Sequence, residues 1–432
     1  MRGSVITQAL RINIGISGRS MILAAALLLL TVIAAPAQTF QVLHNFTGGN
    51  DGGDAMAGLT MDQAGNLYGT TWSGGSVGVG SVFELQHKGS GWVLKTLYSF
   101  RGGGGAGGDG AGPIARVIFG PDGALYGTTA AGTGASCYYY GYSGCGTVFR
   151  LQPPATVCKE VSCPWTETIL YRAGDDDGQI LAGEVAFDQA GNLYSTVEDG
   201  GEFFNGYVFE LSPSANGHWT STVLHSFNEE QFDGTFPRAG LVIDQAGNLY
   251  GTTTEGGQYA DGTAFELSPS GSGWNETILH SFSSSADGNS PMASLVFGRQ
   301  GNLYGTVFNG GPNGGGTVFE LSPAGGGWTF SLPWSFSGTG NGGEELAAAV
   351  TLDGSGNLYG TTFAGGCCGA GTIFELSPGS GGWSETVLHN FTEGNDGGAP
   401  VSSVVLDSQG NGYGTASLGG ANGKGVIWEV TP

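Results

Sequence analysis

Residues 247–253 read Gly-Asn-Leu-Tyr-Gly-Thr-Thr, and this segment or a near copy occurs seven times along the chain. The tyrosine of each copy marks one repeat unit, and in chain order these are Tyr68, Tyr126, Tyr194, Tyr250, Tyr304, Tyr359 and Tyr413. Neighbouring tyrosines lie 54 to 68 residues apart, a period that is typical of a repeat architecture. Because residues that recur in every copy are expected to build the fold, the repeat specifies the architecture better than the activity.

Each unit holds four short segments of β-strand composition, separated by turn residues. In the fourth unit these segments are 241–244, 249–253, 263–267 and 274–282, and Gly, Ser, Asn and Pro fill the turns between them. No segment after residue 37 has the 3.6-residue period of a helix. Four antiparallel strands per unit, repeated seven times, predict an all-β, seven-bladed β-propeller with four-stranded blades.

The two ends of the repeat region share one divided unit. Residues 42–46 have the composition of a fourth strand without the preceding three, and residues 426–430 have that of a third strand without a fourth. We therefore expect the N-terminal strand to pair with the C-terminal blade and close the ring, which removes long unpaired edges. The alternative, an open β-solenoid, needs dedicated caps.

The first 37 residues differ from the rest of the chain. Arginines precede an apolar run at 21–34, and Ala35-Pro36-Ala37 fits a signal peptidase site. We expect a signal peptide over residues 1–37 and the propeller over residues 38–432. A membrane anchor is the alternative, but the run is shorter than the roughly 20 residues that span a bilayer. This pattern predicts a secreted or cell-surface protein, with the periplasm as a further location, and no membrane insertion after cleavage.

The chain is strongly acidic, with 13 Lys and Arg against 36 Asp and Glu. Loss of the three arginines in the leader changes the net charge from −23 to −26. A polyanion of this kind repels nucleic acid and anionic lipid, so we expect no nucleic-acid partner. The same charge suits cation binding, and the chain is expected to be a monomer.

An Asp-Gly pair precedes most of the first strands at a constant spacing. The aspartates are Asp51, Asp109, Asp177, Asp233, Asp287 and Asp396. Connections from an outer strand to the next inner strand lie on one face, so we expect these carboxylates to form a rim near the axis. Carboxylates about 10 Å apart repel by about 0.4–1.7 kcal/mol, and a bound Ca²⁺ would relieve this repulsion. The alternative is that Asp-Gly serves as an ordinary turn dipeptide.

Other recurring polar residues are interpreted as structural. The third strands carry one acid per blade, which does not supply the carboxylate pair about 5–9.5 Å apart that glycoside hydrolysis requires. The fourth strands of four units carry a histidine where the other three have an aromatic residue: His44, His225, His280 and His389 against Tyr98, Tyr171 and Trp334. This exchange indicates packing rather than metal ligation or base catalysis. No catalytic residue is indicated.

The second unit is the longest, because both of its loops with paired cysteines carry insertions, one of them at residues 137–145. This insertion holds Tyr138, Tyr139, Tyr140 and Tyr142. Tyrosine offers a large contact area at a low entropy cost, so the loop is a predicted recognition surface on the same face as the aspartates. The alternative is a tolerated surface insertion.

Six cysteines fit an oxidising compartment. Two lie in one loop of the second unit and two in the next, and alternate loops emerge on opposite faces. Pairing within each loop is therefore the better geometry, and it predicts the bridges Cys137–Cys145 and Cys158–Cys163. The adjacent Cys367 and Cys368 form either a vicinal disulfide or two thiols.

The repeat resembles the GloVer tandem-repeat family of exported β-propeller-like proteins. The matching segments are Gly-Asn-Leu-Tyr-Gly-Thr-Thr at 65–71 and 247–253, and Gly-Thr-Val-Phe-Glu-Leu at 316–321 and, with Ile373, at 371–376. The resemblance covers nearly the whole chain after the leader. It implies an exported, cell-surface protein and supplies no catalytic residues.

Three functions are compatible with the sequence. The first is an exported, non-catalytic binding or scaffold propeller that presents one loop-rich acidic face to a glycan or protein partner. The second is a metal-assisted extracellular hydrolase or lyase, lactonase-like, with its site at the central channel. The third is a structural cell-envelope protein. Binding ranks first because no cluster of non-repeating polar residues at the channel mouth is evident from the sequence.

Overall fold

The computed structural model describes residues 38–431 except 90, 104–106, 140–141, 155–163, 175–179, 230–231, 272 and 339–341. The leader predicted at residues 1–37 lies outside the described residues. Among the described residues, no helix has the length and the apolar character that crossing a membrane requires.

Seven four-stranded antiparallel sheets contain most of the strands. The innermost strands are β2 (Thr60–Met61), β6 (Ile118–Phe119), β10 (Ala186–Phe187), β15 (Val242–Ile243), β20 (Val296–Phe297), β25 (Thr351–Leu352) and β30 (Val405–Leu406). The second strands are β3 (Leu67–Thr71), β7 (Leu125–Tyr139), β11 (Leu193–Val197), β16 (Leu249–Thr253), β21 (Leu303–Val307), β26 (Leu358–Thr362) and β31 (Gly412–Ala416).

The third and outer strands are longer. The third strands are β4 (Ser81–Lys88), β8 (Tyr142–Gln152), β12 (Tyr207–Pro213), β18 (Thr263–Ser270), β22 (Gly314–Ala324), β28 (Thr372–Gly379) and β32 (Val426–Thr431). The outer strands are β5 (Gly91–Ser99), β9 (Thr166–Arg172), β13 (Trp219–Ser226), β19 (Gly273–Ser281), β23 (Gly327–Ser337), β29 (Gly382–Asn390) and β1 (Thr39–Asn45). Loops add the pairs β14 (Gly234–Thr235) with β17 (Glu255–Gly256) and β24 (Gly343–Glu344) with β27 (Ala364–Gly365), and the 3-10 turn η2 (Arg299–Gly301).

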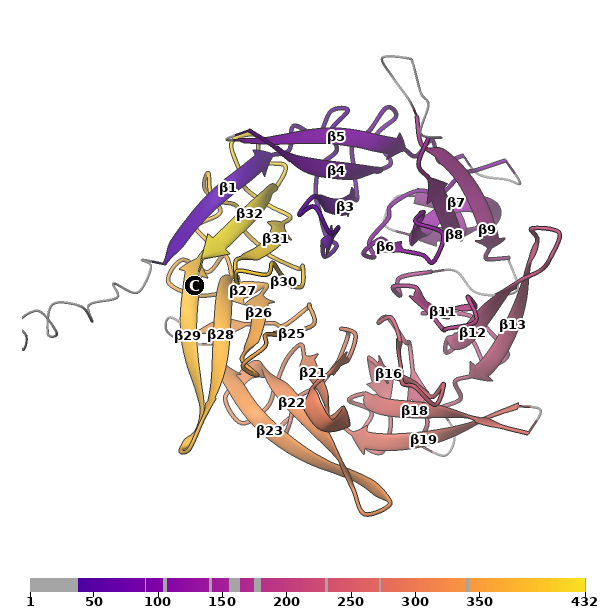
Figure 1. Cartoon of the computed structure of the whole chain (residues 1–432). Coiled ribbons are helices and arrows are strands. Elements are labelled where there is room, and N and C mark those ends of the chain that lie inside the picture. Colours follow the sequence, from indigo (N-terminus) through magenta and orange to yellow (C-terminus); the bar gives the residue numbers. More distant parts are fainter. Residues whose placement is uncertain are drawn as a thin grey trace, which may run out of the picture. The chain divides into compact units, whose positions relative to one another are not determined.

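The sheets form the blades of a seven-bladed propeller, as Figure 1 shows, and this confirms the predicted fold class. Strand β1 pairs with β32 in antiparallel register, from Thr39 opposite Thr431 to Asn45 opposite Val426. The N-terminal strand is therefore the outer strand of the seventh blade, and it closes the ring as predicted.

The recurring tetrapeptide has a local explanation in each turn. In the fourth unit, the Asp244 carboxylate accepts hydrogen bonds from the backbone N–H groups of Ala246 and Asn248 at 2.8 and 2.9 Å. The hydroxyl of Tyr250 reaches the same carboxylate at 3.2 Å. In the next strand pair, Gly251 lies opposite Phe265, and a Cβ on this glycine would stand 2.6 Å from the Phe265 ring. These positions repeat because each blade needs this turn and this close packing.

The hydrophobic core lies between neighbouring blades. One cluster joins Phe227 of the third unit to Leu241 and Phe265 of the fourth. The closing interface is built alike, since Phe46 and its neighbours on the seventh blade pack against the first blade. Side chains of this kind are buried, and the removal of their apolar area from water stabilises the ring.

Near the axis, a threonine on each second strand links its blade to the next. Its hydroxyl donates to a backbone carbonyl of the following unit at 2.8–3.2 Å. The donors in chain order are Thr70, Thr128, Thr196, Thr252, Thr306, Thr361 and Thr415. The last bond, from Thr415 to Ala57, joins the seventh unit to the first.

Candidate functional site

Two classes of loop emerge from opposite faces of the propeller. In an antiparallel four-stranded blade, the loop between strands two and three shares a face with the connection to the next blade. We call this side the loop face. The turn that begins at Asp244 and the hairpin between β18 and β19 lie on the other side.

The predicted acidic rim lies on the loop face, but each aspartate is tied to an outer strand rather than to the axis. A β-bulge in each outer strand precedes the residue whose ring meets the acid, and bulges commonly redirect a side chain in this way. The contacts are Asp51 to His44 at 3.1 Å, Asp109 to Tyr98 at 2.8 Å, Asp233 to His225 at 3.1 Å, Asp287 to His280 at 2.6 Å and Asp396 to His389 at 3.1 Å. Asp177 lies outside the described residues.

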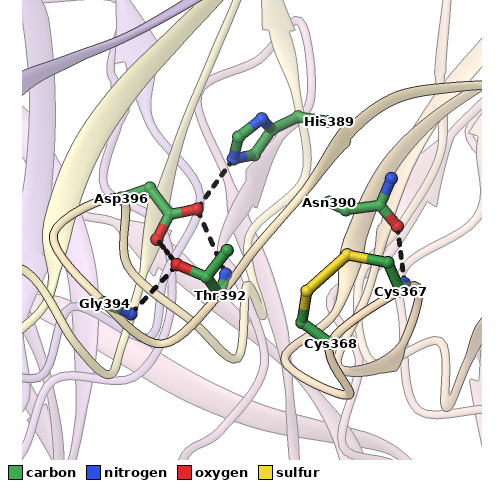
Figure 2. Close-up of a disulfide and its surroundings, with 7 residues drawn as sticks. All are labelled: Cys367, Cys368, His389, Asn390, Thr392, Gly394 and Asp396. Atoms are coloured by element: carbon green, nitrogen blue, oxygen red, sulfur yellow. Dashed lines mark hydrogen bonds and ion pairs between the residues drawn. A yellow bond between two sulfur atoms is a disulfide. The ribbon is translucent and has the colours of Figure 1, made fainter.

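Figure 2 shows this arrangement at the end of β29. The Asp396 Oδ2 atom meets the His389 imidazole and accepts the backbone N–H of Thr392, and the Thr392 hydroxyl donates to Asp396 Oδ1. Burial lowers the pKa of His389, and Asp396 partly offsets that effect. None of the five described aspartates lines the central channel. The expected ring of acids around the axis is therefore not the arrangement observed for these five, because hydrogen bonds hold each one beside its own outer strand.

The residue that faces His225, His280 or His389 comes from the outer strand of the next blade. Phe330 stacks on His280 with ring centroids 3.9 Å apart, and Phe40 stacks on His389 at 3.6 Å. These two pairs agree with the interpretation of the histidines as packing residues. His225 instead faces Glu276, whose carboxylate lies 3.7 Å from the imidazole. Burial, and then the charge of Asp233, raises the pKa of Glu276 to about 9.

The central channel has an apolar mouth to which every unit contributes one residue. These residues are Met56, Ile114, Ala182, Arg238, Met292, Ala347 and Val401, with Trp72 beside them. Together they enclose a cavity of about 580 Å³. Of the seven ring positions, the arginine in the fourth unit is the polar one.

Two ion pairs occupy the channel at positions that do not repeat. Arg238 donates to Glu198 at 2.6 Å, and Arg116 donates to Glu184 at 2.9 Å. Burial raises the pKa of Glu198, and Arg238 acts in the opposite direction. The second carboxylate oxygen of Glu198 is buried and has no hydrogen-bond partner among the described residues. Such a pair can hold a polar group of a ligand at the end of an otherwise apolar pocket.

These four residues were not among the candidates predicted from the sequence. They come from three different units, and their partners lie 40 and 68 residues away in the chain. The signal that could have found them is departure from the repeat. For example, Arg238 stands where the other units have Met, Ile, Ala or Val.

The insertion of the second unit extends β7 and β8 into a long hairpin whose tip region reaches the first unit. The Tyr142 hydroxyl donates to the Trp72 carbonyl at 3.3 Å, and the two rings lie 4.9 Å apart. Tyr142 therefore stands beside the channel mouth. Tyr138 and Tyr139 lie on β7, opposite Ser143 and Tyr142. The side chains of those two tyrosines and the whole of Tyr140 fall outside the described parts.

Two of the predicted cysteine pairs fall within the described residues. The sulfur atoms of Cys137 and Cys145 are bonded at the base of the inserted hairpin, with Cα atoms 4.9 Å apart. Cys367 and Cys368 are also bonded, and Cys367 donates its N–H to the Asn390 side chain (Figure 2). The pair predicted between Cys158 and Cys163 lies outside the described residues and remains a prediction.

Exposed apolar side chains gather on the loop face. Eight of the ten large apolar residues that the described structure exposes lie in its loops: Met56, Val77, Phe203, Phe204, Phe232, Tyr259, Phe363 and Leu418. The other two are Val93 and Val223, which lie on outer strands. Within the described residues, the loops of the opposite face contribute none. Exposed apolar groups concentrated on one face are typical of an interaction surface.

Comparison with known proteins adds a family, which is recognised from the sequence. Among curated proteins, none matches this chain in sequence. A candidate 6-phosphogluconolactonase from Bacteroides uniformis has a similar structure, with 12% identity, a TM-score of 0.46 and coverage of 78% of this chain and 84% of its own. A candidate oxidoreductase, a glucose dehydrogenase, from Thermus thermophilus reaches 13% identity and a TM-score of 0.43, covering 91% of this chain and 100% of its own.

A sequence family model gives a more specific result. The model of the Gloeobacter/Verrucomicrobia repeat matches residues 31–163 and 137–349. The two matches overlap and together cover well over half of the chain, and they include five of the seven copies of the recurring segment, those marked by Tyr68 to Tyr304. The chain therefore belongs to the Gloeobacter/Verrucomicrobia repeat family.

Proposed function

We propose that this protein is an exported, non-catalytic binding propeller that engages a protein or glycan partner with its loop face. The observation that carries the proposal is the concentration of exposed apolar side chains on that face. Phe204 and Phe232 are 72% and 64% exposed, and the channel mouth with Trp72 and Tyr142 lies on the same side. Aromatic residues of this kind supply much of the binding energy in interfaces.

The chemistry of the face suits a partner that combines apolar contact with positive charge. The aromatic rings offer a surface for apolar side chains or for the faces of sugars. The net charge of −23 favours encounter with a basic partner over an acidic one. The ion pair of Arg238 and Glu198 at the mouth adds one donor and one acceptor for orientation.

The proposal is tested with three substitutions that leave the core intact. Phe204→Asn, Phe232→Asn and Tyr259→Asn remove exposed aromatic groups, and Asn tolerates the positive φ of 60° and 66° at the first two sites. The matched control combines Val93→Ser with Val223→Ser on the outer strands. The chain from residue 38 onward is applied to a glycan array and to an envelope extract of the producing cell.

We expect retention of a ligand by the wild type and by the control, and binding at least about tenfold weaker in the triple variant. Equal loss in the control and in the triple variant would contradict a role for the loop face. A wild type that retains neither a glycan nor a protein would remove the binding proposal and favour a structural envelope role.

The channel supports a second candidate, a hydrolase or lyase with its site at the axis. The observation that favours it is the set of charged residues Arg116, Glu184, Glu198 and Arg238, which no repeat requirement explains. Each carboxylate is engaged by an arginine, so neither is arranged as a metal ligand. Turnover of lactone or polysaccharide substrates that Glu198→Gln abolishes, with the melting temperature unchanged, would establish this candidate.

A further inference from the structure

The crevice between outer strands β13 and β19 brings together three side chains that ligate metals in other proteins. His225 follows the bulge of β13, Asp233 lies in the loop after it, and Glu276 projects from β19 of the next blade. The His225 Nε2 atom lies 3.1 Å from Asp233 Oδ2 and 3.7 Å from Glu276 Oε2. One ligand atom of each residue lies within 4.8 Å of the other two.

The other six crevices provide an internal comparison. The residues at the register position of Glu276 are Leu94, Glu167, Ser221, Phe330, Glu385 and Phe40. The two phenylalanines stack on histidines, whereas Glu167 belongs to the crevice of Tyr98 and Glu385 to that of Trp334. Among the described residues, an acid meets a His–Asp pair only in the crevice between the third and fourth units. The fold therefore does not require this combination.

The charges in this crevice are incompletely compensated by the protein. Two carboxylates share one imidazole, and the side chain of Glu276 is only 15% exposed. Its Oε1 atom is buried and has no hydrogen-bond partner among the described residues. A buried carboxylate without a counter-charge is costly, so Glu276 either holds a proton or gives it up to bind a cation.

We propose that His225, Asp233 and Glu276 form a binding site for a divalent transition-metal ion, with Zn²⁺ as the best fit. Tetrahedral coordination at about 2.0–2.1 Å places ligand atoms about 3.3 Å apart, and the two observed separations from His225 bracket that value. One imidazole nitrogen with two carboxylates suits Zn²⁺ or Mn²⁺, whereas Ca²⁺ requires six to eight oxygen ligands. The fourth position stays open to solvent or to a ligand.

The surroundings already orient the ligands. The Asp233 carboxylate accepts hydrogen bonds from the backbone N–H groups of Asn228 at 2.9 Å and Gly234 at 2.6 Å, and these two bonds fix its orientation. Outer contacts of this kind hold metal-binding carboxylates in position. The hydrogen bond between His225 and Asp233 must break on binding, because the metal takes the Nε2 lone pair and the imidazole then carries its proton on Nδ1. Binding therefore becomes weaker as the pH falls.

The test is calorimetric titration of EDTA-stripped protein with Zn²⁺, with Co²⁺ absorption as a readout of coordination. The wild type is expected to bind one equivalent. Glu276→Gln keeps the size and shape of the side chain but removes one carboxylate ligand. His225→Tyr replaces the imidazole with the residue that two other units have at this position. Both variants should bind Zn²⁺ at least about tenfold more weakly. The matched control is Glu385→Gln, the same change at the same register position, which should bind as the wild type does.

Several outcomes would overturn the proposal. The wild type binds no Zn²⁺, or both site variants bind it as tightly as the wild type, or the control loses as much affinity as Glu276→Gln. Circular dichroism melts separate loss of binding from loss of fold. If Glu276→Gln fails to fold, His225→Tyr decides the outcome alone, and a tetrahedral Co²⁺ spectrum that persists in it refutes the assignment.

Discussion

Replacement of Phe46 by alanine tests whether the N-terminal strand completes the seventh blade. Phe46 follows β1 and is 0% exposed, and its ring centroid lies 5.4 Å from that of Phe83 in the first blade. Its counterpart in the fourth unit is Phe282, which is also 0% exposed and lies 5.0 Å from Phe319 of the next blade. The two side chains occupy the same place in two different interfaces. One interface is continuous in sequence and the other joins the two ends of the chain.

The expected cost follows from this burial. Loss of a fully buried phenylalanine side chain removes its transfer free energy and leaves a cavity, which together amount to about 3–5 kcal/mol. Because Phe46 and Phe282 have equal exposure and similar aromatic neighbours, both alanine variants should lose the same amount within about 1 kcal/mol. In a domain of this size, a loss of about 4 kcal/mol lowers the melting temperature by about 5 °C.

Urea denaturation followed by tryptophan fluorescence measures both free energies of unfolding. Equal m-values in the wild type and both variants would show that the comparison concerns the same transition. If Phe46→Ala costs less than about 1 kcal/mol while Phe282→Ala costs the full amount, the first strand contributes little to the core and the closed ring is wrong. Equal and large losses are the expected result.

Three further predictions concern single side chains. Gly251→Ala should lose about 1–3 kcal/mol because its Cβ meets the Phe265 ring, whereas Gly273→Ala, with no atom within 4 Å, should be neutral; urea melts decide. Thr415→Val should cost about 1–2 kcal/mol at the closing joint, since a buried carbonyl loses its donor, and a loss below about 0.3 kcal/mol would contradict this. Burial, and then the charge of Asp109, raises the pKa of Glu167 to about 7 in the folded protein. The protonated side chain therefore favours the folded state. This contribution to the free energy of unfolding is complete below the unfolded pKa of about 4.3 and is lost as the pH rises through 7. Between about pH 5 and 8 the free energy of unfolding should therefore fall less in Glu167→Gln than in the wild type. The difference should be less than about 1 kcal/mol because solvent screens the charge, and urea melts at both pH values measure it.

The fold could be predicted because each unit repeats the same turn and packing residues. The turn at Asp244 and the glycine beneath Phe265 depend on residues that are close in sequence or in the adjacent strand, so a single unit is enough to read them. Ring closure was predictable for a different reason. The first and last segments are complementary parts of one blade, and their pairing in the structure runs from Thr39 to Asn45.

The positions of the aspartates were harder to predict, because spacing along the chain does not fix distance from the axis. The connection between blades starts at the periphery, beside the outer strand, and reaches the channel only near Met56. Asp51 lies in the first part of that connection, where the His44 side chain and the Thr47 amide hold it. The number of residues between the aspartate and the first strand does not determine how far its carboxylate lies from the axis.

Departures from the repeat are the most informative positions for function, and in the channel they are not spread evenly around the ring. Arg116, Glu184, Glu198 and Arg238 all come from the second to fourth units, next to the inserted hairpin that carries Tyr142. A partly buried ion pair adds little to stability compared with the small or apolar residues that occupy most of the equivalent positions in other units. Stability therefore does not explain their presence, and the binding role proposed above is the explanation that remains to be tested. The described residues of the fifth to seventh units hold no ion pair in the channel, so the charged side chains lie on one side of it.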